Sequence, residues 1–271
     1  MTLPPSAGVI GWPVAHSKSP LIHRFWLAKL GLDGDYGRFP VHPGNLGTAI
    51  RALPALGLRG VNVTVPHKVA VMEYLDRIDG AAERIGAVNT VITGVGGLTG
   101  FNTDAAGFLD PLDALVQGLQ TIVVIGAGGA ARAVVAAVID AGVEDIIIVN
   151  RSAGKAIELM HEFSALGCTE TLYPGLRVTP CDLLVNATSL GMTGQPPLDI
   201  VLDDLAASTI VYDIVYSPLE TPLLATARAR GLRTIDGLQM LVGQAAAAFE
   251  LFFGQPAPRQ HDAELRALLT A

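Results

Sequence analysis

The chain has 271 residues, of which 50% are hydrophobic and 16% are charged, and its formal net charge at pH 7 is −7. This length allows one large domain or two of ordinary size, and the apolar content supplies buried cores for either. A chain with this net negative charge lacks the overall positive charge typical of proteins that bind nucleic acid or an anionic membrane. Any anionic ligand therefore has to be held by local lysines, arginines and backbone amides.

The cysteines and the apolar runs bear on where the protein works. Cys168 and Cys181 are too few for a disulfide framework in a chain of this length, which favours a reducing compartment. The N-terminus has no basic region followed by an apolar stretch, and no uncharged apolar run reaches transmembrane length. We therefore expect a cytoplasmic protein with no membrane or nucleic-acid partner, either a monomer or a homodimer.

The first hundred residues alternate strand-like and helix-like segments, which favours an α/β layer arrangement. The expected strands are residues 7–11, 36–41 and 60–65. The expected helices are residues 20–30, 46–56 and 66–76.

Residues 61–68 run from one of these strands into the following helix. Asn62 and Thr64 share one face of the strand, and Pro66 suits the first turn of a helix, where its missing N–H costs nothing. The sequence thus places Asn62, Thr64 and Lys68 at one end of the predicted strand. The opposite face, which we expect to be buried, carries three valines: Val61, Val63 and Val65.

A second α/β region begins near residue 102. Residues 121–125 form a continuous apolar run, as expected for a strand buried on both faces of a parallel sheet. A helix over residues 130–141 follows it. The last predicted helix, residues 238–253, is very apolar and rich in small residues, so we expect it to pack closely against other structure. The remaining expected strands are residues 145–149, 183–186, 210–213 and 233–235.

A glycine fingerprint lies between the strand at 121–125 and its helix, the context that raises such a pattern above chance. Gly126 permits a tight turn, Gly128 lets the backbone approach a pyrophosphate, and Ala131 allows helix and strand to pack closely. The helix N-terminus supplies N–H groups for the phosphates. The alternative is a glycine-rich turn without a ligand. The predicted cofactor loop comprises Gly126, Ala127, Gly128, Gly129 and Ala130.

The end of the next strand favours NADP over NAD as the cofactor. NAD-binding proteins usually place Asp or Glu there to hold the ribose 2′-hydroxyl, whereas this chain has Asn150, Arg151, Ser152 and Lys155. Arg151 offers a planar donor fork for a 2′-phosphate, and Lys155 adds a second positive charge. The alternative is a solvated cationic helix start.

Lys68 and Asp104 are the predicted catalytic pair. Oxidising an alcohol by hydride transfer requires a cofactor to take the hydride and a group to take the hydroxyl proton, which a lysine in a suitable environment can do. A nearby aspartate can hold the ammonium group in place. A lone lysine is more often a surface residue, but the polar residues at 62, 64 and 102–104 favour the catalytic interpretation. The six histidines lack metal-ligand spacing, so no metal site is predicted.

Taken together, these motifs resemble the shikimate dehydrogenase family, and the resemblance covers nearly the whole chain. It implies reversible NADPH-linked reduction of 3-dehydroshikimate to shikimate, in chorismate and aromatic amino-acid biosynthesis. The matching segments are residues 11–20, 62–68, 86–90, 100–104, 126–131, 186–192, 212–218 and 236–244.

The fold expected from the elements and the resemblance is two α/β domains with a cleft between them. Residues 1–101 would form a substrate-binding domain with a mostly parallel sheet, to which the C-terminal helices of residues 238–271 return. Residues 102–237 would form a Rossmann-like NADP-binding domain.

The resemblance also implies roles for individual residues. Ser17 and Ser19 would bind the substrate carboxylate, with help from Tyr216, and Ser19 would also cap the helix that begins at Pro20. Gln244, on the last helix, would help to close the site. The other residues implied to bind the substrate are Asn62, Thr64, Lys68, Asn89 and Asp104. Further residues implied to approach the cofactor are Thr188, Ser189, Ile214, Gly237 and Met240.

Three other functions fit part of the pattern. A quinate/shikimate dehydrogenase using NAD, or an aminoshikimate dehydrogenase, would share the substrate motifs, although Arg151 and Lys155 argue against NAD. A non-catalytic metabolite-binding regulator on the same fold would be expected to lack Lys68 or Asp104, and both are present. A glutamyl-tRNA reductase would carry a nucleophilic cysteine near its N-terminus, where this chain has none.

Overall fold

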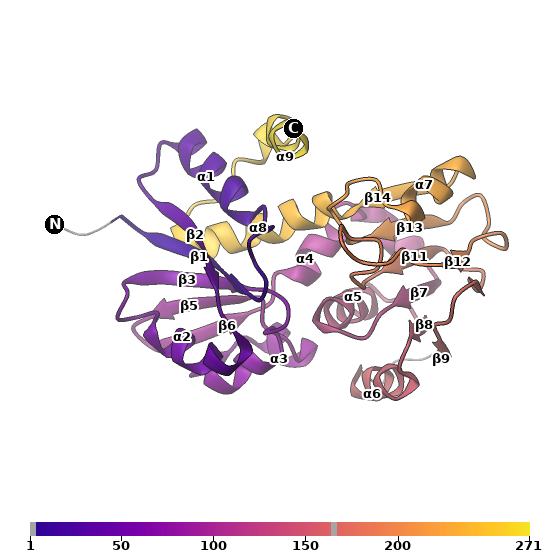
Figure 1. Ribbon diagram of the computed structural model, residues 1–271, viewed down its shortest axis with the longest axis horizontal. Helices are drawn as coiled ribbons and strands as arrows, with labels where there is room; N and C mark the ends of the chain where they lie inside the picture. The colour runs from indigo at the N-terminus through magenta and orange to yellow at the C-terminus, as the bar shows by residue number, and fades with distance from the viewer. Residues whose placement is uncertain (1–3, 164–166) are drawn as a thin grey trace. The chain divides into compact units, whose positions relative to one another are not determined.

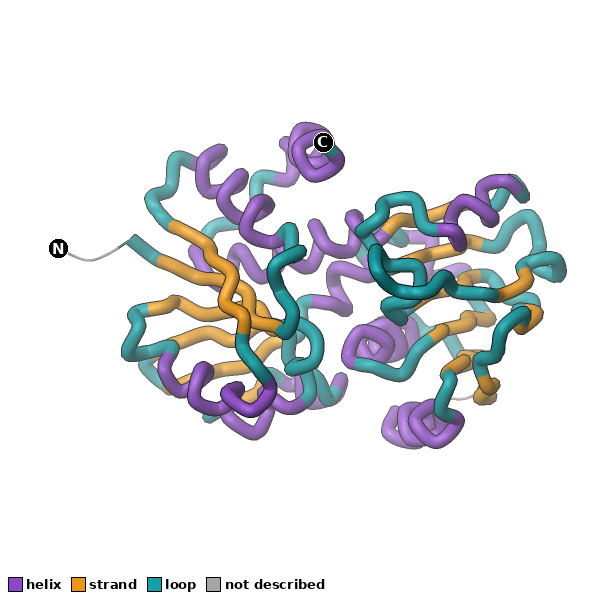
Figure 2. Tube along the Cα trace, in the orientation of Figure 1, coloured by secondary structure: helices purple, strands orange, loops and turns teal. Residues whose placement is uncertain are grey.

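The computed structural model describes residues 4–163 and 167–271. The chain divides into two compact units. Unit 1 combines Met1–Thr103 with Val242–Ala271, and unit 2 is Asp104–Leu241. In each unit the strands gather into a sheet with helices against its faces (Figures 1 and 2).

The sheet of unit 1 is mixed, with more parallel than antiparallel pairs. β1 is parallel to both of its neighbours, β2 and β3, whereas β5 is antiparallel to β3 and to β6. The β5–β6 hairpin is absent from the elements expected from the sequence. In the described residues the strand order is β2 (Asp35–Pro40), β1 (Ser6–Gly11), β3 (Leu58–Val63), β5 (Thr90–Gly94), β6 (Gly97–Phe101) and β4 (Arg77–Ile78).

The helices of unit 1 follow the expected pattern in part. The helix predicted over residues 20–30 is confirmed as α1 (Ser19–Leu30), whereas the one predicted over 46–56 ends early, as α2 (Leu46–Ala52). Gly57, at φ 67°, directly precedes β3 and turns the chain into it. The other helical segments are η1 (Pro43–Asn45), η2 (Ala70–Tyr74), α3 (Gly80–Ile85), η4 (Arg259–His261), α9 (Asp262–Thr270) and the later part of α8 (Gly237–Phe253).

The helix predicted over residues 66–76 is wrong. The backbone carbonyl of Lys68 accepts from the N–H of Val88 at 2.8 Å, so it is not used for a helical bond four residues further on. Only the short 3₁₀ helix η2 forms there. Val65, predicted to share the buried strand face, lies beyond the end of β3 and is 68% exposed, and Asn62 on the opposite face is buried.

The C-terminal helices complete the core of unit 1. Ala248 and Phe252 of α8 pack against Val9 of β1 and Tyr36 of β2, which confirms the expected close packing of the apolar last helix. A salt bridge of 2.7 Å joins Lys29 of α1 to Glu264 of α9.

Unit 2 contains a six-stranded sheet in which every described pair is parallel. Read by their order in the chain, its main strands follow the pattern 3-2-1-4-5-6, the order of a dinucleotide-binding Rossmann fold. The strands, from one edge to the other, are β9 (Gly167–Thr171), β8 (Asp145–Asn150), β7 (Thr121–Ile125), β11 (Leu183–Asn186), β13 (Ile210–Asp213) and β14 (Arg233–Asp236). β10 (Leu176–Arg177) and β12 (Ile200–Val201) form a separate pair.

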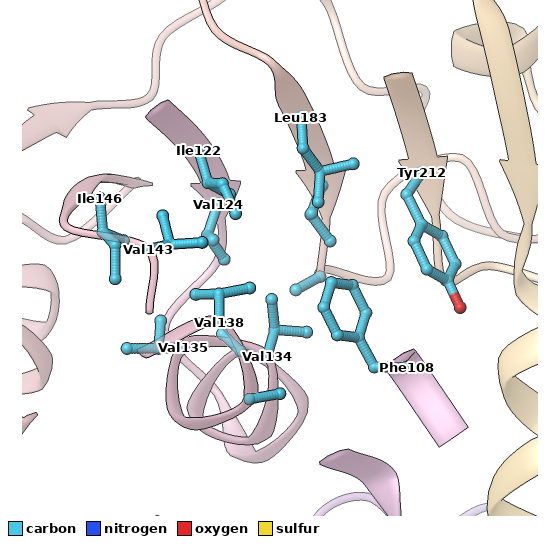
Figure 3. Close-up of a cluster of buried hydrophobic side chains, with 14 of the residues drawn as sticks. Phe108, Ile122, Val124, Val134, Val135, Val138, Val143, Ile146, Leu183 and Tyr212 are labelled. Atoms are coloured by element: carbon cyan, nitrogen blue, oxygen red, sulfur yellow. The ribbon is translucent and has the colours of Figure 1, made fainter. Parts of the chain in front are cut away.

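Apolar strand residues and one helix make the core of unit 2. Figure 3 shows Val124 of β7 and Val134 and Val138 of a helix side by side in this cluster. The ring of Phe108 stacks on Tyr212, with centroids 5.0 Å apart. Each fully buried aliphatic side chain contributes about 1.5–3 kcal/mol. The helices are α4 (Asp104–Leu109), η3 (Asp113–Gly118), α5 (Gly129–Asp140), α6 (Ala153–Phe163) and α7 (Pro222–Ala229).

In the part of the chain that the structure describes, no helix is both long enough and apolar enough to span a bilayer.

Candidate functional site

The predicted site residues lie in two groups, one in each unit. Those of unit 1 gather where β1 and β3 end and β5 begins. β3 is antiparallel to β5, and Asn62 of β3 lies directly opposite Thr90 of β5. This register brings Asn89, which precedes Thr90, to the same sheet edge as Asn62.

Ser17 and Ser19 lie together after β1. Their hydroxyl oxygens are 3.2 Å apart, and both residues are buried, at 6% and 5% exposure. The prediction that Ser19 caps α1 is wrong, because Lys18 is the capping residue and Ser19 is the first residue of the helix. The hydroxyl of Ser17 instead accepts the Ser19 N–H at 3.3 Å. The pair therefore presents two hydroxyl groups at a helix N-terminus, where an anion is favoured.

A cation lies beside this serine pair, and a second one extends from it to α9. The guanidinium of Arg38, on β2, donates to the carbonyl oxygen of Ser17, with its Nε at 2.9 Å. The ammonium group of Lys18 donates to the carbonyl oxygen of Leu269, near the C-terminus of α9. The Arg38 contact places positive charge at Ser17, in a chain whose net charge is −7.

Asn62 and Asn89 form a buried hydrogen-bonded group with their neighbours. The Asn62 amide nitrogen donates to the carbonyl oxygen of Asn89 at 3.2 Å and to the Thr90 hydroxyl at 2.9 Å. The Asn89 side-chain oxygen accepts from the Thr90 hydroxyl at 2.9 Å and from the N–H of Thr103 at 2.8 Å. The hydroxyl of Tyr36 donates to the Asn62 side-chain oxygen at 2.6 Å. The amide orientations are thereby fixed.

The backbone of the segment around Lys68 is held on both sides. The Thr64 N–H donates to the carbonyl oxygen of Ile10 at 2.9 Å, and Val88 donates to the Lys68 carbonyl oxygen. His67 is buried, and its Nε2 lies 2.8 Å from the carbonyl oxygen of Val41. The Lys68 and Thr64 side chains are half-buried. Gln244, on α8, is 9% exposed.

In unit 2, Asp104 begins α4 and is 4% exposed. A carboxylate is favoured at a helix N-terminus because the helix dipole is positive there. Tyr216, predicted to help with the substrate carboxylate, is half-buried after β13.

The glycine loop lies where β7 meets α5. Gly126 has φ 120°, and a Cβ there would lie 3.0 Å from the carbonyl oxygen of Ala187 and 3.1 Å from Thr188. Gly128 caps α5, and a Cβ at this position would meet no described atom within 4 Å. Gly128 thus leaves open space beside the backbone at the start of α5, as the approach of a pyrophosphate requires. The loop also lies beside β11, next to the point where strand order reverses.

A buried polar group fixes the loop after β11. Asn186 donates to the carboxylate of Asp213 on the neighbouring strand at 2.9 Å, and its oxygen accepts from the Thr188 hydroxyl at 2.7 Å. Asp213 also accepts from the Thr221 hydroxyl at 2.6 Å. Burial raises the pKa of the Asp213 carboxyl, and these hydrogen bonds oppose that rise. Thr188 is therefore held beside Gly126, with Ser189 next to it.

Gly237 and Ile214 also come together. A Cβ at Gly237 would lie 2.2 Å from the carbonyl oxygen of Ile214, so only glycine fits this approach. Met240 lies one turn further along α8 and packs in the same core cluster as Ile214.

The segment that would select the cofactor's phosphate is exposed. Asn150 ends β8, and its amide donates to the carbonyl oxygen of Ser152 at 2.9 Å. Arg151, Ser152 and Lys155 are all exposed where α6 begins. Among the described residues neither Arg151 nor Lys155 forms an ion pair. This site fits a solvent-accessible phosphate.

Some polar residues at these sites were not predicted from the sequence. Tyr36 and Arg38 of β2 fall outside every motif used there, and only the contacts of the folded chain bring them to Asn62 and Ser17. The Asn186–Asp213 contact could have been predicted from the sequence. Each residue ends an apolar strand, and the ends of neighbouring parallel strands meet at the same edge of a sheet. Among residues 4–163 and 167–271, no group of three histidine, cysteine or acidic side chains is placed to hold a metal ion.

Three family models match parts of the chain. They are described as Shikimate dehydrogenase substrate binding domain over residues 9–91, Shikimate / quinate 5-dehydrogenase over residues 114–191, and Shikimate 5'-dehydrogenase C-terminal domain over residues 237–264.

Whole-length relatives agree with these matches. A shikimate dehydrogenase (NADP(+)) of Sphingopyxis alaskensis is 54% identical, with 98% of this chain and 97% of the relative covered. A shikimate 5-dehydrogenase of Thermus thermophilus, solved in complex with NADP(H) and shikimate, is 36% identical, with a TM-score of 0.84 over 98% of this chain and 99% of that one. A ligand-free 5-ketofructose reductase of a Gluconobacter strain is 33% identical, with a TM-score of 0.89 over 99% and 100% of the two chains.

Proposed function

Because this chain belongs to the shikimate dehydrogenase family, we propose how its own side chains carry out that family's reaction. The chain is an NADP-dependent oxidoreductase that interconverts shikimate and 3-dehydroshikimate. We assign the substrate to unit 1 and the cofactor to unit 2. The match of residues 9–91 to a substrate-binding domain and the Rossmann strand order of unit 2 support this division.

Substrate binding begins with the carboxylate. Ser17 and Ser19 donate to it from the start of α1, and Tyr216 is assigned to assist them. Arg38, which donates to the Ser17 carbonyl oxygen, supplies positive charge nearby in a chain whose net charge is −7.

The ring hydroxyl groups are bound by a second set of polar residues. Their side chains combine fixed amides with hydroxyl and charged groups, so they can match both donors and acceptors on a polyhydroxylated ring. The set is Asn62, Thr64, Lys68, Asn89, Asp104 and Gln244.

Proton transfer is assigned to Lys68 and Asp104. In the oxidative direction the Lys68 amine takes the proton of the reacting hydroxyl group, while the C–H bond gives up its hydride and the C–O bond becomes a carbonyl. The chemistry supplied by bound NADP⁺ is acceptance of that hydride. The carboxylate of Asp104 stabilises the resulting ammonium ion. In the reductive direction Lys68 returns the proton to the new hydroxyl oxygen.

The residues of unit 2 fit NADP. The open space at Gly128 and the first N–H groups of α5 would hold the pyrophosphate. Arg151, with Ser152, Lys155 and Asn150, would hold the 2′-phosphate. Thr188, Ser189, Ile214, Gly237 and Met240 would line the path toward the nicotinamide.

The observation that carries this proposal is a pair of exposed cations after β8, Arg151 and Lys155, which have no ion-pair partner among the described residues and lie where an NAD enzyme would present an acid. The test measures NADPH or NADH formation from shikimate and from quinate, each with NADP and with NAD. We expect shikimate with NADP to give the highest kcat/KM. A preference for quinate with NAD would replace the proposal with the quinate/shikimate alternative.

Replacing Arg151 with Ala sharpens the cofactor test. The variant should raise KM for NADP by roughly tenfold to a hundredfold and leave KM for NAD nearly unchanged, because only NADP carries the 2′-phosphate. Arg233→Ala is the matched control, since Arg233 is an exposed cation at the opposite, amino end of a parallel strand. Equal losses with both cofactors in Arg151→Ala would remove Arg151 from phosphate recognition.

We also propose that the enzyme works in the cytoplasm. Cys168 and Cys181 are both free thiols, and burial raises the pKa of Cys181 to about 12. Unpaired cysteines suit a reducing compartment.

A further inference from the structure

We propose that Asp213 is a positioning residue for the nicotinamide end of NADP, because its buried carboxylate ties together the loops that follow β11 and β13. The loop after β11 carries Thr188 and Ser189, and the loop after β13 carries Ile214. The proposed function assigns these three residues to the path toward the nicotinamide. The inference rests on that assignment and adds a residue that acts on the cofactor only through the two loops.

Asp213 lies in the row of residues from which these loops depart. β7, β11 and β13 are neighbouring parallel strands, and their last residues, Ile125, Asn186 and Asp213, pair in one row. The residue after Ile125 is Gly126, the first glycine of the proposed pyrophosphate loop. Open α/β sheets bind ligands at the carboxyl ends of their strands, where the strand order reverses. The carboxylate is therefore at the correct edge of the sheet to organise a cofactor site.

The Asp213 carboxylate is buried and is bound by three neutral donors. Asp213 is 0% exposed, and among the described residues it forms no ion pair. One oxygen accepts from the Asn186 amide at 2.9 Å and from the Val215 N–H at 3.0 Å. The other oxygen accepts from the Thr221 hydroxyl at 2.6 Å. Since a buried carboxylate is costly without donors, these contacts keep it in the fold.

The three donors depend on the carboxylate in turn. Both hydrogens of the Asn186 amide are in use, because the carbonyl oxygen of Leu190 accepts the second one at 3.1 Å. The Val215 N–H and the Thr221 hydroxyl proton have no other acceptor within the described residues. All three donors are buried. Without the carboxylate they would be left unsatisfied, and the loops after β11 and β13 would have to move to reach water.

A movement of either loop would alter the proposed cofactor site. The Asn186 side-chain oxygen accepts from the Thr188 N–H at 3.1 Å and from its hydroxyl at 2.7 Å. A Cβ added to Gly126 would lie 3.1 Å from Thr188, so this loop lies against the glycine loop. A Cβ added to Gly237 would lie 2.2 Å from the carbonyl oxygen of Ile214. A displaced loop would therefore change the space beside one of these two glycines.

The test is Asp213→Ala, which removes both acceptor oxygens. Calorimetry should show the dissociation constant of NADP raised roughly tenfold, because the cofactor would have to order the two loops itself. kcat should fall by roughly fivefold or more, since hydride transfer requires a nicotinamide held in one position. The dissociation constant of shikimate without cofactor should be unchanged, because the substrate is assigned to unit 1.

A fragment of the cofactor separates this role from a general loss of structure. Adenosine 2′,5′-bisphosphate keeps the 2′-phosphate assigned to Arg151 and lacks the nicotinamide. Its dissociation constant should stay within about twofold of the wild-type value in Asp213→Ala, because about the same contacts are available to it. Arg151→Ala should instead weaken the fragment and NADP together. An unchanged dissociation constant for NADP in folded Asp213→Ala, or equal losses for NADP and the fragment, would overturn the inference.

Asp182→Ala is the matched control. The Asp182 carboxylate also joins separate segments of unit 2, since it accepts from the N–H groups of Gln120 and Thr121 at 2.8 and 3.0 Å. It directly precedes β11, so it lies at the opposite, amino end of the same sheet, where no ligand is assigned. This variant should leave the dissociation constants of NADP and of the fragment unchanged. A loss of NADP affinity as large as that in Asp213→Ala would overturn the inference.

Two further variants cover the case in which Asp213→Ala does not fold. Asp213→Asn should bind NADP within about threefold of the wild type, because its oxygen can still accept from Asn186 and Val215 while its NH2 group donates to the Thr221 oxygen. Asn186→Ala should weaken NADP by roughly fivefold and spare the fragment, since it breaks the tie from its other end. Unchanged NADP binding in Asn186→Ala would overturn the inference. Failure of the wild-type protein to oxidise shikimate with NADP would instead refute the proposed function.

Discussion

The buried imidazole of His23 should make unit 1 sensitive to acid. His23 lies on α1 at 0% exposure, and among the described residues neither of its ring nitrogens has a hydrogen-bond partner. Burial lowers the pKa of His23 from 6.5 to about 3. The folded chain therefore keeps this ring neutral at a pH where the unfolded chain protonates it.

The sign and size of the effect follow from the two pKa values. Above pH 6.5 the ring is neutral in both states, and His23 contributes no pH dependence. As the pH falls from 6.5 toward 3 the unfolded state binds the additional proton, so the free energy of unfolding decreases. With pKa values of 6.5 and about 3, the loss between pH 8 and pH 5 is about 2 kcal/mol.

The variant that tests this is His23→Phe, which keeps an aromatic ring against Tyr36 and removes the titrating nitrogens. Denaturant unfolding followed by tryptophan fluorescence reports unit 1 alone, because Trp12 and Trp26 are the two tryptophans of the chain and both lie there. The decrease in unfolding free energy from pH 8 to pH 5 should be about 2 kcal/mol smaller in the variant than in the wild type.

The comparison concerns the slope with pH, so a constant packing difference between the two side chains does not affect it. The same slope in His23→Phe and the wild type would refute the assignment of a neutral, buried His23.

Two further predictions concern the proposed catalytic and carboxylate-binding residues. Lys68→Ala should lower kcat by roughly 10²–10⁴-fold while KM for shikimate changes only modestly, because a proton-transfer group acts mainly in the transition state; near-normal kcat would remove Lys68 from the mechanism. The double variant Ser17→Ala with Ser19→Ala should raise KM for shikimate more than it lowers kcat, since each hydroxyl donates to a charged group at about 1.5–3 kcal/mol. An unchanged KM would place the carboxylate elsewhere.

The sequence predicted the parallel strands of unit 2 closely. The strands expected over residues 121–125, 183–186 and 210–213 have these bounds in the structure. Their apolar runs are short, continuous and bounded by turn residues, which is the pattern typical of strands buried on both faces of a parallel sheet. The glycine loop could be placed for the same reason, since it must follow the first of these strands.

The segment after β3 shows why local pattern failed elsewhere. Pro66 and the polar residues that follow it are compatible with a first helical turn, but tertiary contacts decide the outcome. The Lys68 carbonyl oxygen accepts a hydrogen bond from the Val88 N–H, and His67 Nε2 lies within hydrogen-bond distance of the Val41 carbonyl oxygen. Neither partner is near in sequence, so no window of neighbouring residues contains the information.

The roles of Tyr36 and Arg38 could not be predicted for a related reason. In the sequence they belong to a short strand with a tyrosine and an arginine, a composition typical of many exposed edge strands. Their significance arises from the pairing of β1 between β2 and β3, which brings Tyr36 within reach of Asn62.

The composition of unit 1 from both ends of the chain has a consequence for synthesis on the ribosome. Ala248 and Phe252, which pack on Val9 and Tyr36, emerge only after the whole of unit 2 has been made. At about 5–20 residues per second, residues 104–271 take on the order of ten to thirty seconds to translate. During that interval the nascent β1 and β2 hold an apolar face that their own chain cannot yet cover. Unit 2 is one continuous stretch of chain, so all of its residues are available as soon as it has been made. We therefore expect a chaperone that shields newly made protein to bind mainly at the N-terminal strands.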